Sequence, residues 1–396
     1  MPQQQSPEQQ GSSVPIISLV NNYLHHAVRL KASDIHFEPD EDFMRVRLRI
    51  DGRLHEVGKE SMETYAAVIA RIKVLGNLDI AEPKKYQDGR FPFVIEDRRY
   101  DIRFSIFPTI YGSVAVLRIL NTTSIELGLD PLGMADDQRE IFEGMIKRPY
   151  GMLLVTGPNG SGKTTTLYSA LHTINSTDIS IATLEDPVEY QLPLLRQSQI
   201  DVERNLTFAN GLRALLRQDP DVIMVGEIRD AETAKIAVQA SMTGHLVLST
   251  LHTNNSIGAL VRIVNMGVET FLVAYATVGV LAQRLVRVLC NDCKQETEID
   301  PIVAERLGME KGTKVFKSVG CNKCNDSGYR GRTGIFELLV VDEQLRHMLF
   351  QKATIDELYK YALSQGMKTL RVHGIEKVKQ GVTSIDEVLS ITESGL

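Results

Sequence analysis

A glycine-rich segment between an apolar run and a helical pattern carries the clearest chemistry in the sequence. Leu153–Val155 leads into Gly157–Thr164, which has the spacing G-x-x-x-x-G-K-[ST]. Glycines let successive backbone N–H groups curl around a phosphate, because no Cβ atom blocks the approach. Lys163 supplies a charge for the β- and γ-phosphates, and the Thr164 hydroxyl can ligate Mg²⁺. The alternative is a strand–helix turn without a ligand. We predict a nucleoside triphosphate site made by Gly157, Pro158, Asn159, Gly160, Ser161, Gly162, Lys163, Thr164 and Thr165.

An acidic residue follows another short apolar run. Val222–Val225 leads to Gly226 and Glu227, so a glutamate behind a glycine stands where the second element of such a site usually has an aspartate. Glu227 can polarise an attacking water. The alternative role, capping the helix predicted over Ala231–Met242, already belongs to Asp230. We therefore predict that Glu227 is catalytic.

Two further apolar runs carry side chains suited to the same reaction. The run Ile179–Leu184 ends in Glu185. Ligands of open α/β sheets bind at the carboxyl ends of the strands, so Glu185 is a candidate for the shell of the water or of Mg²⁺. A plain solvated loop acid is the alternative. His252 lies beyond the run Leu246–Ser249, on the edge where a γ-phosphate would be sensed. His245 lies before that run; it is included among the candidate catalytic residues, although its position leaves its role open.

The cysteines form two C-x-x-C pairs, and they are the only cysteines in the chain: Cys290, Cys293, Cys321 and Cys324. In a reducing compartment this spacing favours a metal over disulfides. Two such pairs separated by a module-sized loop suit tetrahedral Zn²⁺ in a closed structural site. Buried free thiols or a redox pair are the alternatives. We predict a zinc site.

Composition and charge limit the function further. The 396 residues allow two or three domains. Met1–Gln10 lacks the pattern of a signal peptide, and the most apolar run, Phe271–Ala282, is too short to span a bilayer; we predict a core helix there. The net charge of −6 argues against a protein that wraps nucleic acid. We expect a cytosolic protein that can dock on a membrane protein.

The first part of the chain mixes helical and strand patterns. Apolar spacing predicts a helix over Pro15–Leu30 and another over Tyr65–Leu75. Alternation in Met44–Ile50 predicts a strand with arginines on one face, and Asp51-Gly52 after it is a hairpin turn signal. A second hairpin is predicted over Phe91–Ile106. This pattern indicates an α+β domain.

From Asp136 onwards, helical stretches alternate with short apolar runs, which is typical of a parallel sheet covered on both faces. Asp342–Ile391 reads as helical, with a break at Gly381. The predicted organisation is a disordered leader, an α+β domain, a linker, an α/β ATPase core, a four-cysteine module and a helical region, over residues 1–13, 14–120, 121–135, 136–288, 289–337 and 338–396.

These residues resemble the secretion ATPase superfamily, in particular the type II secretion and type IV pilus extension ATPases. Besides the phosphate loop, the resemblance rests on an acidic box, an arginine-containing helix, an atypical second element, a histidine box and three motifs of the first domain. They are Thr183–Glu189, Leu212–Asp221, Val225–Asp230, Thr243–His252, Ser33–His36, Asp51-Gly52 and Gln87–Arg90.

The resemblance implies a homo-hexameric ring in which each subunit joins a PAS-like amino-terminal domain to a RecA-like core. It also implies that arginines of the first domain reach ATP across a domain or subunit boundary, here Arg103 and Arg118, with Arg90 as a weaker candidate. Surface ion pairs are the alternative for each. The chain departs from the family at Gly112–Val114, where Gly-Glu-Arg is usual, so one expected charge pair is absent.

The implied function is ATP hydrolysis that drives type II secretion or pilus assembly through an inner-membrane platform protein. The enzyme would be cytoplasmic and peripheral to the membrane through its partners. The cysteine module is similar to that of secretion and extension ATPases and favours assembly over pilus retraction. A nucleic-acid motor and a nucleotide-gated scaffold without turnover are the rival interpretations.

Overall fold

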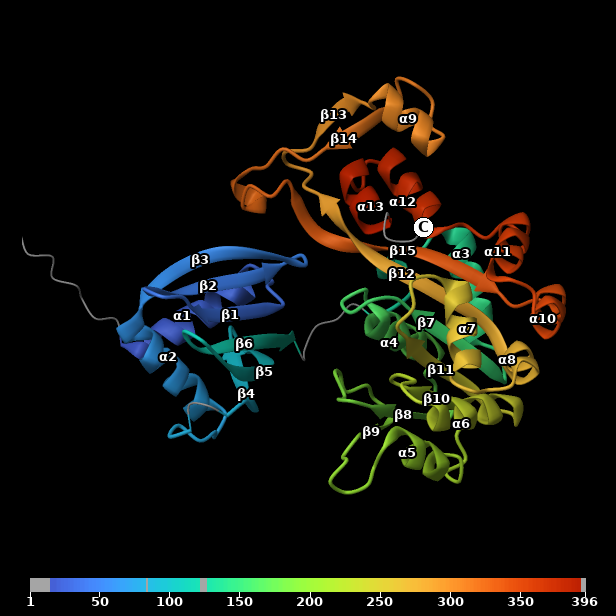
Figure 1. Ribbon diagram of the computed structural model, residues 1–396, viewed down its shortest axis with the longest axis horizontal. Coiled ribbons are helices and arrows are strands. Elements are labelled where there is room, and N and C mark those ends of the chain that lie inside the picture. The colour runs from blue at the N-terminus through green and yellow to red at the C-terminus, as the bar shows by residue number, and fades with distance from the viewer. Residues whose placement is uncertain (1–14, 83–84, 122–126, 393–396) are drawn as a thin grey trace, which may run out of the picture. The chain divides into compact units, whose positions relative to one another are not determined.

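The computed structural model describes residues 15–82, 85–121 and 127–392, and the predicted leader 1–13 and part of the predicted linker lie outside them. The chain divides into two compact units, Met1–Ile125 and Glu126–Leu396 (Figure 1). Each unit has its own hydrophobic core.

The first unit is an antiparallel sheet with two helices on one face. The strand order is β3-β2-β1-β6-β5-β4. Its strands are β1 Asp34–Pro39, β2 Phe43–Ile50, β3 Arg53–Ser61, β4 Gln87–Ile95, β5 Arg98–Thr109 and β6 Gly112–Asn121, and its helices are α1 Ile16–Arg29 and α2 Met62–Leu75. Leu24 and Ile72 of the helices are fully buried against inward-facing strand residues such as Leu48 and Leu117. The predicted helices and both hairpins are therefore confirmed.

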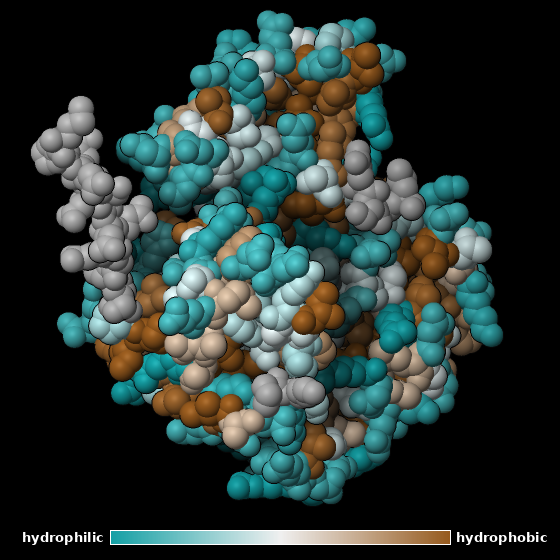
Figure 2. Space-filling model, turned by 60° about the vertical axis from the view of Figure 1, so that its left-hand side comes forward, coloured by the Kyte–Doolittle hydropathy of each residue, from teal (hydrophilic) through white to brown (hydrophobic). Residues whose placement is uncertain are grey.

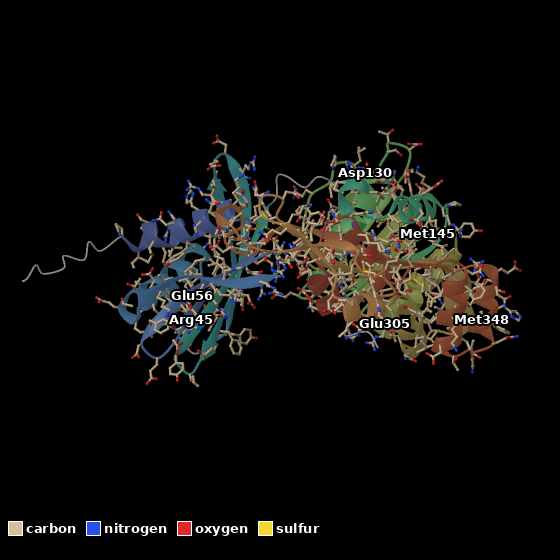
Figure 3. All side chains as sticks on the ribbon, turned by 90° about the horizontal axis from the view of Figure 1, so that it is seen from above. Arg45, Glu56, Asp130, Met145, Glu305 and Met348 are labelled. Carbon is tan, nitrogen blue, oxygen red and sulfur yellow. The ribbon has the colours of Figure 1, made fainter. Side chains whose placement is uncertain are left out.

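The opposite face of this sheet carries charged side chains along β2. Because side chains alternate along a strand, Arg45, Arg47 and Arg49 of β2 share this face while the residues between them are buried. Arg47 pairs with Glu38 at 2.7 Å. Arg45 pairs with Glu56 of β3 at 3.4 Å, and both residues are labelled in Figure 3. These ion pairs join β2 to its two neighbouring strands on this face.

The second unit is built on a seven-stranded sheet of order β15-β12-β7-β11-β10-β8-β9. All neighbouring pairs are parallel except β12 with β15. Its strands are β7 Gly151–Thr156, β8 Ile181–Glu185, β9 Arg196–Gln199, β10 Val222–Val225, β11 Leu246–Leu251, β12 Thr277–Leu289 and β15 Tyr329–Val340. The central strands β7, β8, β10 and β11 are buried along their whole length.

Helices cover both faces of this sheet, as predicted. One face packs against α3 Asp136–Ile146 and α4 Lys163–Ile174, where Phe142 and Leu171 are fully buried. The short helix η1 Asp130–Leu132 precedes α3. The other face packs against α5 Phe208–Leu215, α6 Ala231–Met242, α7 Ser256–Asn265, α8 Thr270–Ala276, α10 Glu343–Phe350 and α11 Ile355–Ser364.

A smaller core lies at the far end of the two long strands β12 and β15. Val286 and Ile335 of these strands pack there with Leu370 and Val388 of the last two helices. Figure 1 shows these helices beside the two strands. The elements around this core are β13 Gln295–Glu298, α9 Pro301–Leu307, β14 Lys314–Lys317, η2 Asn322–Cys324, α12 Leu370–Lys379 and α13 Ile385–Thr392. The predicted break at Gly381 falls between α12 and α13 and is confirmed.

The prediction of a single core helix over Phe271–Ala282 is wrong. The helix α8 ends at Ala276, and Thr277 begins the long strand β12, which pairs with β7 on one side and β15 on the other. A buried apolar run has no periodicity that separates helix from strand, and here two neighbouring strands decide the outcome. The strand β15 also crosses the predicted boundary between residues 337 and 338.

Among the described residues, no helix is both long enough and apolar enough to cross a membrane. The face of the molecule in Figure 2 is mixed, with hydrophobic residues gathered in several separate patches among hydrophilic ones.

Candidate nucleotide site and cysteine cluster

The predicted phosphate loop lies between the carboxyl end of β7 and the amino end of α4. Gly157 has φ +153°, and a Cβ on it would lie 2.5 Å from the carbonyl oxygen of Gln283. Gly162 caps α4 with φ +89°, in the left-handed region that favours glycine. The loop therefore needs glycine at both places. The helix that follows the loop, α4, begins there, so its first N–H groups and the positive end of its dipole are available to an anion.

The side chain of Lys163 is folded over this loop. Its Nζ donates to the carbonyl oxygens of Gly157 at 2.8 Å and Pro158 at 3.0 Å. Burial lowers the pKa of Lys163 to about 8, Glu227 opposes that shift, and the charge of Arg284 adds to it. Thr164 is exposed at the start of α4, so its hydroxyl is accessible to a metal ion.

A glutamine that the sequence analysis missed supports the loop from the neighbouring strand β12. Gln283 is buried, its Nε2 donates to the carbonyl oxygen of Ser161 at 2.6 Å, and its Oε1 accepts from Thr166 Oγ1 at 2.8 Å. Both ends of the amide are therefore used to join the loop and α4 to β12. The sequence signal for this role was a polar pair, Gln283 and Arg284, directly after the apolar run Phe271–Ala282. Because that run was predicted to be a helix, the pair was not expected to lie on a strand beside the phosphate loop.

Glu227 lies just after β10, beside the end of β11. Its carboxylate pairs with Arg229 and lies 3.3 Å from His252 Nε2, and Arg229 also pairs with Asp186 at 3.3 Å. Burial raises the pKa of Glu227, but Arg229 and His252 together outweigh that effect and lower the pKa. The side chain is thus held as a carboxylate, which is the form that can accept a proton from water. The site brings Glu227 and His252 together.

Glu185 ends β8 and is buried. Its carboxylate accepts from Thr183 Oγ1 at 2.5 Å, from Gln197 Nε2 at 3.1 Å and from the Tyr168 hydroxyl. Tyr168 comes from α4, so the helix that follows the phosphate loop also holds this acid. Burial and the neighbouring carboxylate raise the pKa of Tyr168, which stays a hydrogen-bond donor.

His245 is not brought to the phosphate loop. It precedes β11, and the parallel register places Leu246 beside Gly151 and Leu251 beside Thr156. The phosphate loop follows Thr156, so His245 lies at the opposite edge of the sheet. Its Nδ1 lies 3.0 Å from the carbonyl oxygen of Ala240.

The three predicted arginines lie in one cross-strand row of the first unit. Arg90 faces Arg103 across β4 and β5, and Arg103 faces Arg118 across β5 and β6. Arg118 pairs with Asp34 at 3.0 Å and remains two-thirds exposed, and Arg103 pairs with Asp101 at 3.5 Å. The cross-strand pairing therefore places three guanidinium groups side by side on one face of the sheet.

The four predicted cysteines meet in one cluster, with all Sγ atoms within 4.8 Å of one another. Neighbouring sulfurs are 3.9 Å apart for Cys290 and Cys321, 3.8 Å for Cys293 and Cys324, and 3.7 Å for Cys321 and Cys324. Four thiolates at about 2.3 Å around a tetrahedral Zn²⁺ lie about 3.8 Å apart, so the cluster fits that ion.

The local backbone also favours the thiolate form. The N–H groups of Cys321 and Gly328 each donate to Cys324 Sγ at 3.2 Å. Burial raises the pKa of the Cys324 thiol, but these hydrogen bonds, together with those from the side chains of Cys321 and Cys293, outweigh it and lower the pKa to about 7. A thiolate is the form that binds metal.

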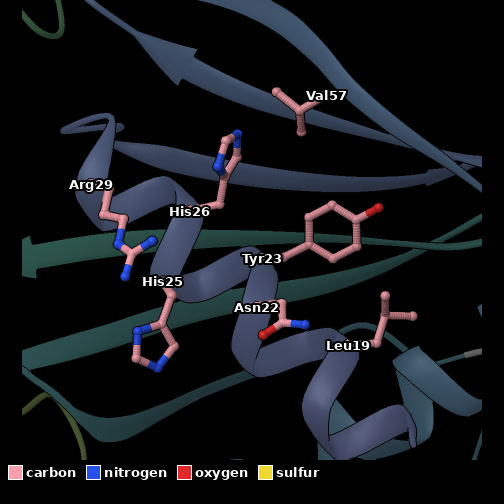
Figure 4. A pocket seen from close by; sticks show the side chains of 7 residues that line it. All are labelled: Leu19, Asn22, Tyr23, His25, His26, Arg29 and Val57. Carbon is pink, nitrogen blue, oxygen red and sulfur yellow. The ribbon is translucent and has the colours of Figure 1, made fainter. Parts of the chain in front are cut away.

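An open groove of about 550 Å³ lies in the first unit between α1 and β3. In Figure 4, Tyr23 and His26 point towards the strand that carries Val57, and His25 points to the other side of the helix. Tyr23 donates to Glu60 at 2.6 Å. The groove contains none of the residues predicted to bind nucleotide.

A glycine loop between a strand and a helix of a largely parallel sheet, with an acid after the second strand along from it, is the arrangement of a P-loop protein. A family model described as "Type II/IV secretion system protein" matches residues 9–390. The chain belongs to this family.

Similar proteins agree with that assignment. "Type II secretion system protein E" of Pectobacterium carotovorum subsp. carotovorum is 47% identical over 96% of this chain and 76% of its own length. "Type II secretion system ATPase E" of Vibrio cholerae is 45% identical over 99% of this chain and 78% of its own length.

Solved structures share the fold. The Legionella pneumophila ATPase DotB superposes with a TM-score of 0.72 at 23% identity, over 98% of both chains. The pilus retraction motor PilT with bound ADP superposes with a TM-score of 0.62 at 26% identity, over 93% of this chain and 96% of PilT.

Proposed function

We propose that this chain hydrolyses ATP and uses the energy to drive type II protein secretion. The observation that carries the proposal is the geometry at one sheet edge. A phosphate loop with Lys163 and an ionised Glu227 follow the ends of β7 and β10, and β11 lies between these strands. The two relatives named as type II secretion system proteins, one of them as an ATPase, are 45–47% identical over nearly the whole chain, whereas PilT is 26% identical.

Each residue has a stated role in this proposal. The phosphate loop and Lys163 bind the phosphates, and the Thr164 hydroxyl ligates the Mg²⁺ that neutralises phosphate charge. Glu227 accepts a proton from the attacking water, with His252 beside it. Glu185, which Tyr168 and Gln197 hold in place by hydrogen bonds, helps to orient the attacking water or the waters around Mg²⁺. His245 lies at the opposite edge, and we propose no contact with nucleotide for it.

The proposed assembly is a homo-hexamer in the cytoplasm, bound to the inner membrane through a platform protein and not to nucleic acid. In this assembly Arg103 and Arg118, and Arg90 beside them, complete a nucleotide site of the same or a neighbouring subunit. The exposure of Arg118 supports that role, because its ion pair with Asp34 uses Nε and a solvent-exposed guanidinium can neutralise phosphate charge. We further propose that the cysteine cluster holds one Zn²⁺ as a structural ion.

The first experiment is ATPase rate against protein concentration for the wild type, Lys163→Ala and a matched surface control, Lys235→Ala. We expect specific activity to rise with concentration, Lys163→Ala to lose roughly a hundredfold or more, and Lys235→Ala to match the wild type. No turnover at any concentration, with tight ATP binding, would favour a nucleotide-gated scaffold. Stimulation by DNA would favour a nucleic-acid motor.

A mixing experiment tests the arginines. Arg118→Ala has an intact phosphate loop, and Lys163→Ala has intact arginines. If Arg118 acts on a neighbouring subunit, a mixture of the two inactive variants regains activity. If the mixture stays inactive while each variant is folded, Arg118 does not act across a subunit boundary.

A further inference from the structure

One arginine of β12 lies beside the phosphate loop. Arg284 follows the part of β12 that pairs with β7, where Ala282 lies beside Thr156. Its Nη1 atom is 3.2 Å from the position that a Cβ on Gly157 would occupy. The guanidinium is therefore packed against the first glycine of the loop.

The hydrogen bonds of this guanidinium go to neutral oxygens. Nη1 donates to the carbonyl oxygen of Gln283 at 3.0 Å, and Nη2 donates to the carbonyl oxygen of Asn254 at 3.1 Å and to its Oδ1 at 3.3 Å. Asn254 belongs to the loop after β11 that begins with His252. Arg284 thus joins the phosphate loop to the segment beside Glu227.

The charge of Arg284 has no carboxylate within ion-pair distance among the described residues. Arg287 on the same strand, by contrast, is paired with Glu387 at 2.6 Å. Burial lowers the pKa of Arg284, and Glu337 opposes that shift only as a more distant charge. A half-buried cation without a counterion, next to the buried ammonium of Lys163, is costly unless an anion binds between them.

We propose that Arg284 is a nucleotide-contacting residue that binds the terminal phosphate of ATP from within the same subunit. A phosphate oxygen takes the place of the Asn254 oxygens, which exchanges a neutral hydrogen bond for a charge-assisted one. Because ADP lacks the terminal phosphate, Arg284 favours ATP over ADP. This inference rests on the proposed ATPase function and adds a residue from β12 to its site.

The test is isothermal titration calorimetry of the full chain with a non-hydrolysable ATP analogue and with ADP. The variants are Arg284→Gln, which removes the charge, Arg284→Lys, which keeps it, and Arg262→Gln, a control at an exposed arginine of α7. We expect Arg284→Gln to bind the ATP analogue at least tenfold more weakly, about 1.4 kcal/mol, and ADP less than threefold more weakly. Arg284→Lys should regain part of the difference, and Arg262→Gln should match the wild type.

Two results would overturn the proposal. Equal weakening of both nucleotides, or a loss that Arg284→Lys does not reduce, would mean that Arg284 only holds Asn254 in place. Unchanged binding would mean that it contacts neither nucleotide. Lys163→Ala separates this from failure of the proposed function: if the wild type does not bind ATP, or Lys163→Ala binds it as well, the nucleotide site itself is wrong. If Arg284→Gln does not fold, Arg284→Lys is compared directly with the wild type. The proposal then requires Arg284→Lys to weaken binding of the ATP analogue more than binding of ADP.

Discussion

The ion pair between Arg287 and Glu387 anchors the last helix, α13, to β12, and its removal gives a sharp prediction. Both side chains are buried, with exposed fractions of 10% and 6%. Glu387 Oε2 accepts from Arg287 Nε at 3.0 Å and Nη2 at 2.6 Å, and Oε1 accepts from the Arg287 backbone N–H at 3.1 Å. The guanidinium also lies 3.9 Å from the ring centre of Tyr329.

Glu387→Gln keeps the shape of the side chain and removes the charge. Arg287 then stays buried without a counterion, and breaking such a pair costs about 3–5 kcal/mol. For a unit of this size, each kcal/mol lowers Tm by about 2–4 °C, so we expect a loss of roughly 6–20 °C. The double variant Arg287→Met/Glu387→Leu buries no charge and should regain most of this stability.

The assay is thermal unfolding followed by circular dichroism, with a surface pair as control. Glu143 and Lys147 of α3 pair at 2.6 Å, but their side chains are 39% and 58% exposed. We expect Glu143→Gln to change stability by at most about 0.5 kcal/mol. The reasoning is refuted if Glu387→Gln unfolds within 2 °C of Glu143→Gln, or if the double variant is less stable than Glu387→Gln.

Three further predictions follow from the same structure. Tyr168→Phe removes a donor to Glu185 and should cost about 1.5–3 kcal/mol and lower the ATPase rate; an unchanged Tm and rate would contradict this. Cys293→Ser should abolish a zinc content of about one ion per chain, measured by atomic absorption, and the prediction fails if the zinc remains. Burial lowers the pKa of His373 to about 4, while its Nδ1 accepts from Phe336 N–H. As the pH falls, His373 therefore takes up a proton in the unfolded chain at a higher pH than in the folded chain. The free energy of unfolding is highest above about pH 6.5 and should fall by about 3 kcal/mol towards pH 4. In His373→Asn, urea unfolding should show that pH dependence reduced, and an unchanged dependence would exclude His373 as its source.

The parts of the site that the sequence predicted are those in which function and local structure are encoded in one short segment. The phosphate loop needs glycines at fixed places between a strand and a helix, so its residues also identify its geometry. The same holds for Asp230, which accepts from Thr233 N–H at 2.8 Å and begins α6 as predicted. The alternation of Arg45, Arg47 and Arg49 likewise identified the charged face of β2.

The residues that were missed depend on contacts between distant segments. Gln283 and Arg284 matter only because β12 pairs with β7, and nothing in their own neighbourhood separates a strand from a helix. Glu337 was missed for the same reason. It lies on β15, is buried, and accepts from Ser256 and Tyr359, which come from α7 and α11.

The strand β12 connects three of these features. Gln283 near its middle holds the phosphate loop, Arg287 holds α13, and Cys290 directly after its last residue belongs to the cysteine cluster. A metal ion at the cluster would therefore fix the carboxyl end of β12. The ion pair with α13 fixes the same strand a few residues earlier, at Arg287. Because Gln283 and Arg284 lie on the same strand as the cluster, and that strand pairs with β15, we expect removal of the metal to weaken nucleotide binding. We therefore expect Cys293→Ser to weaken ATP binding, although no cysteine lies in the phosphate loop.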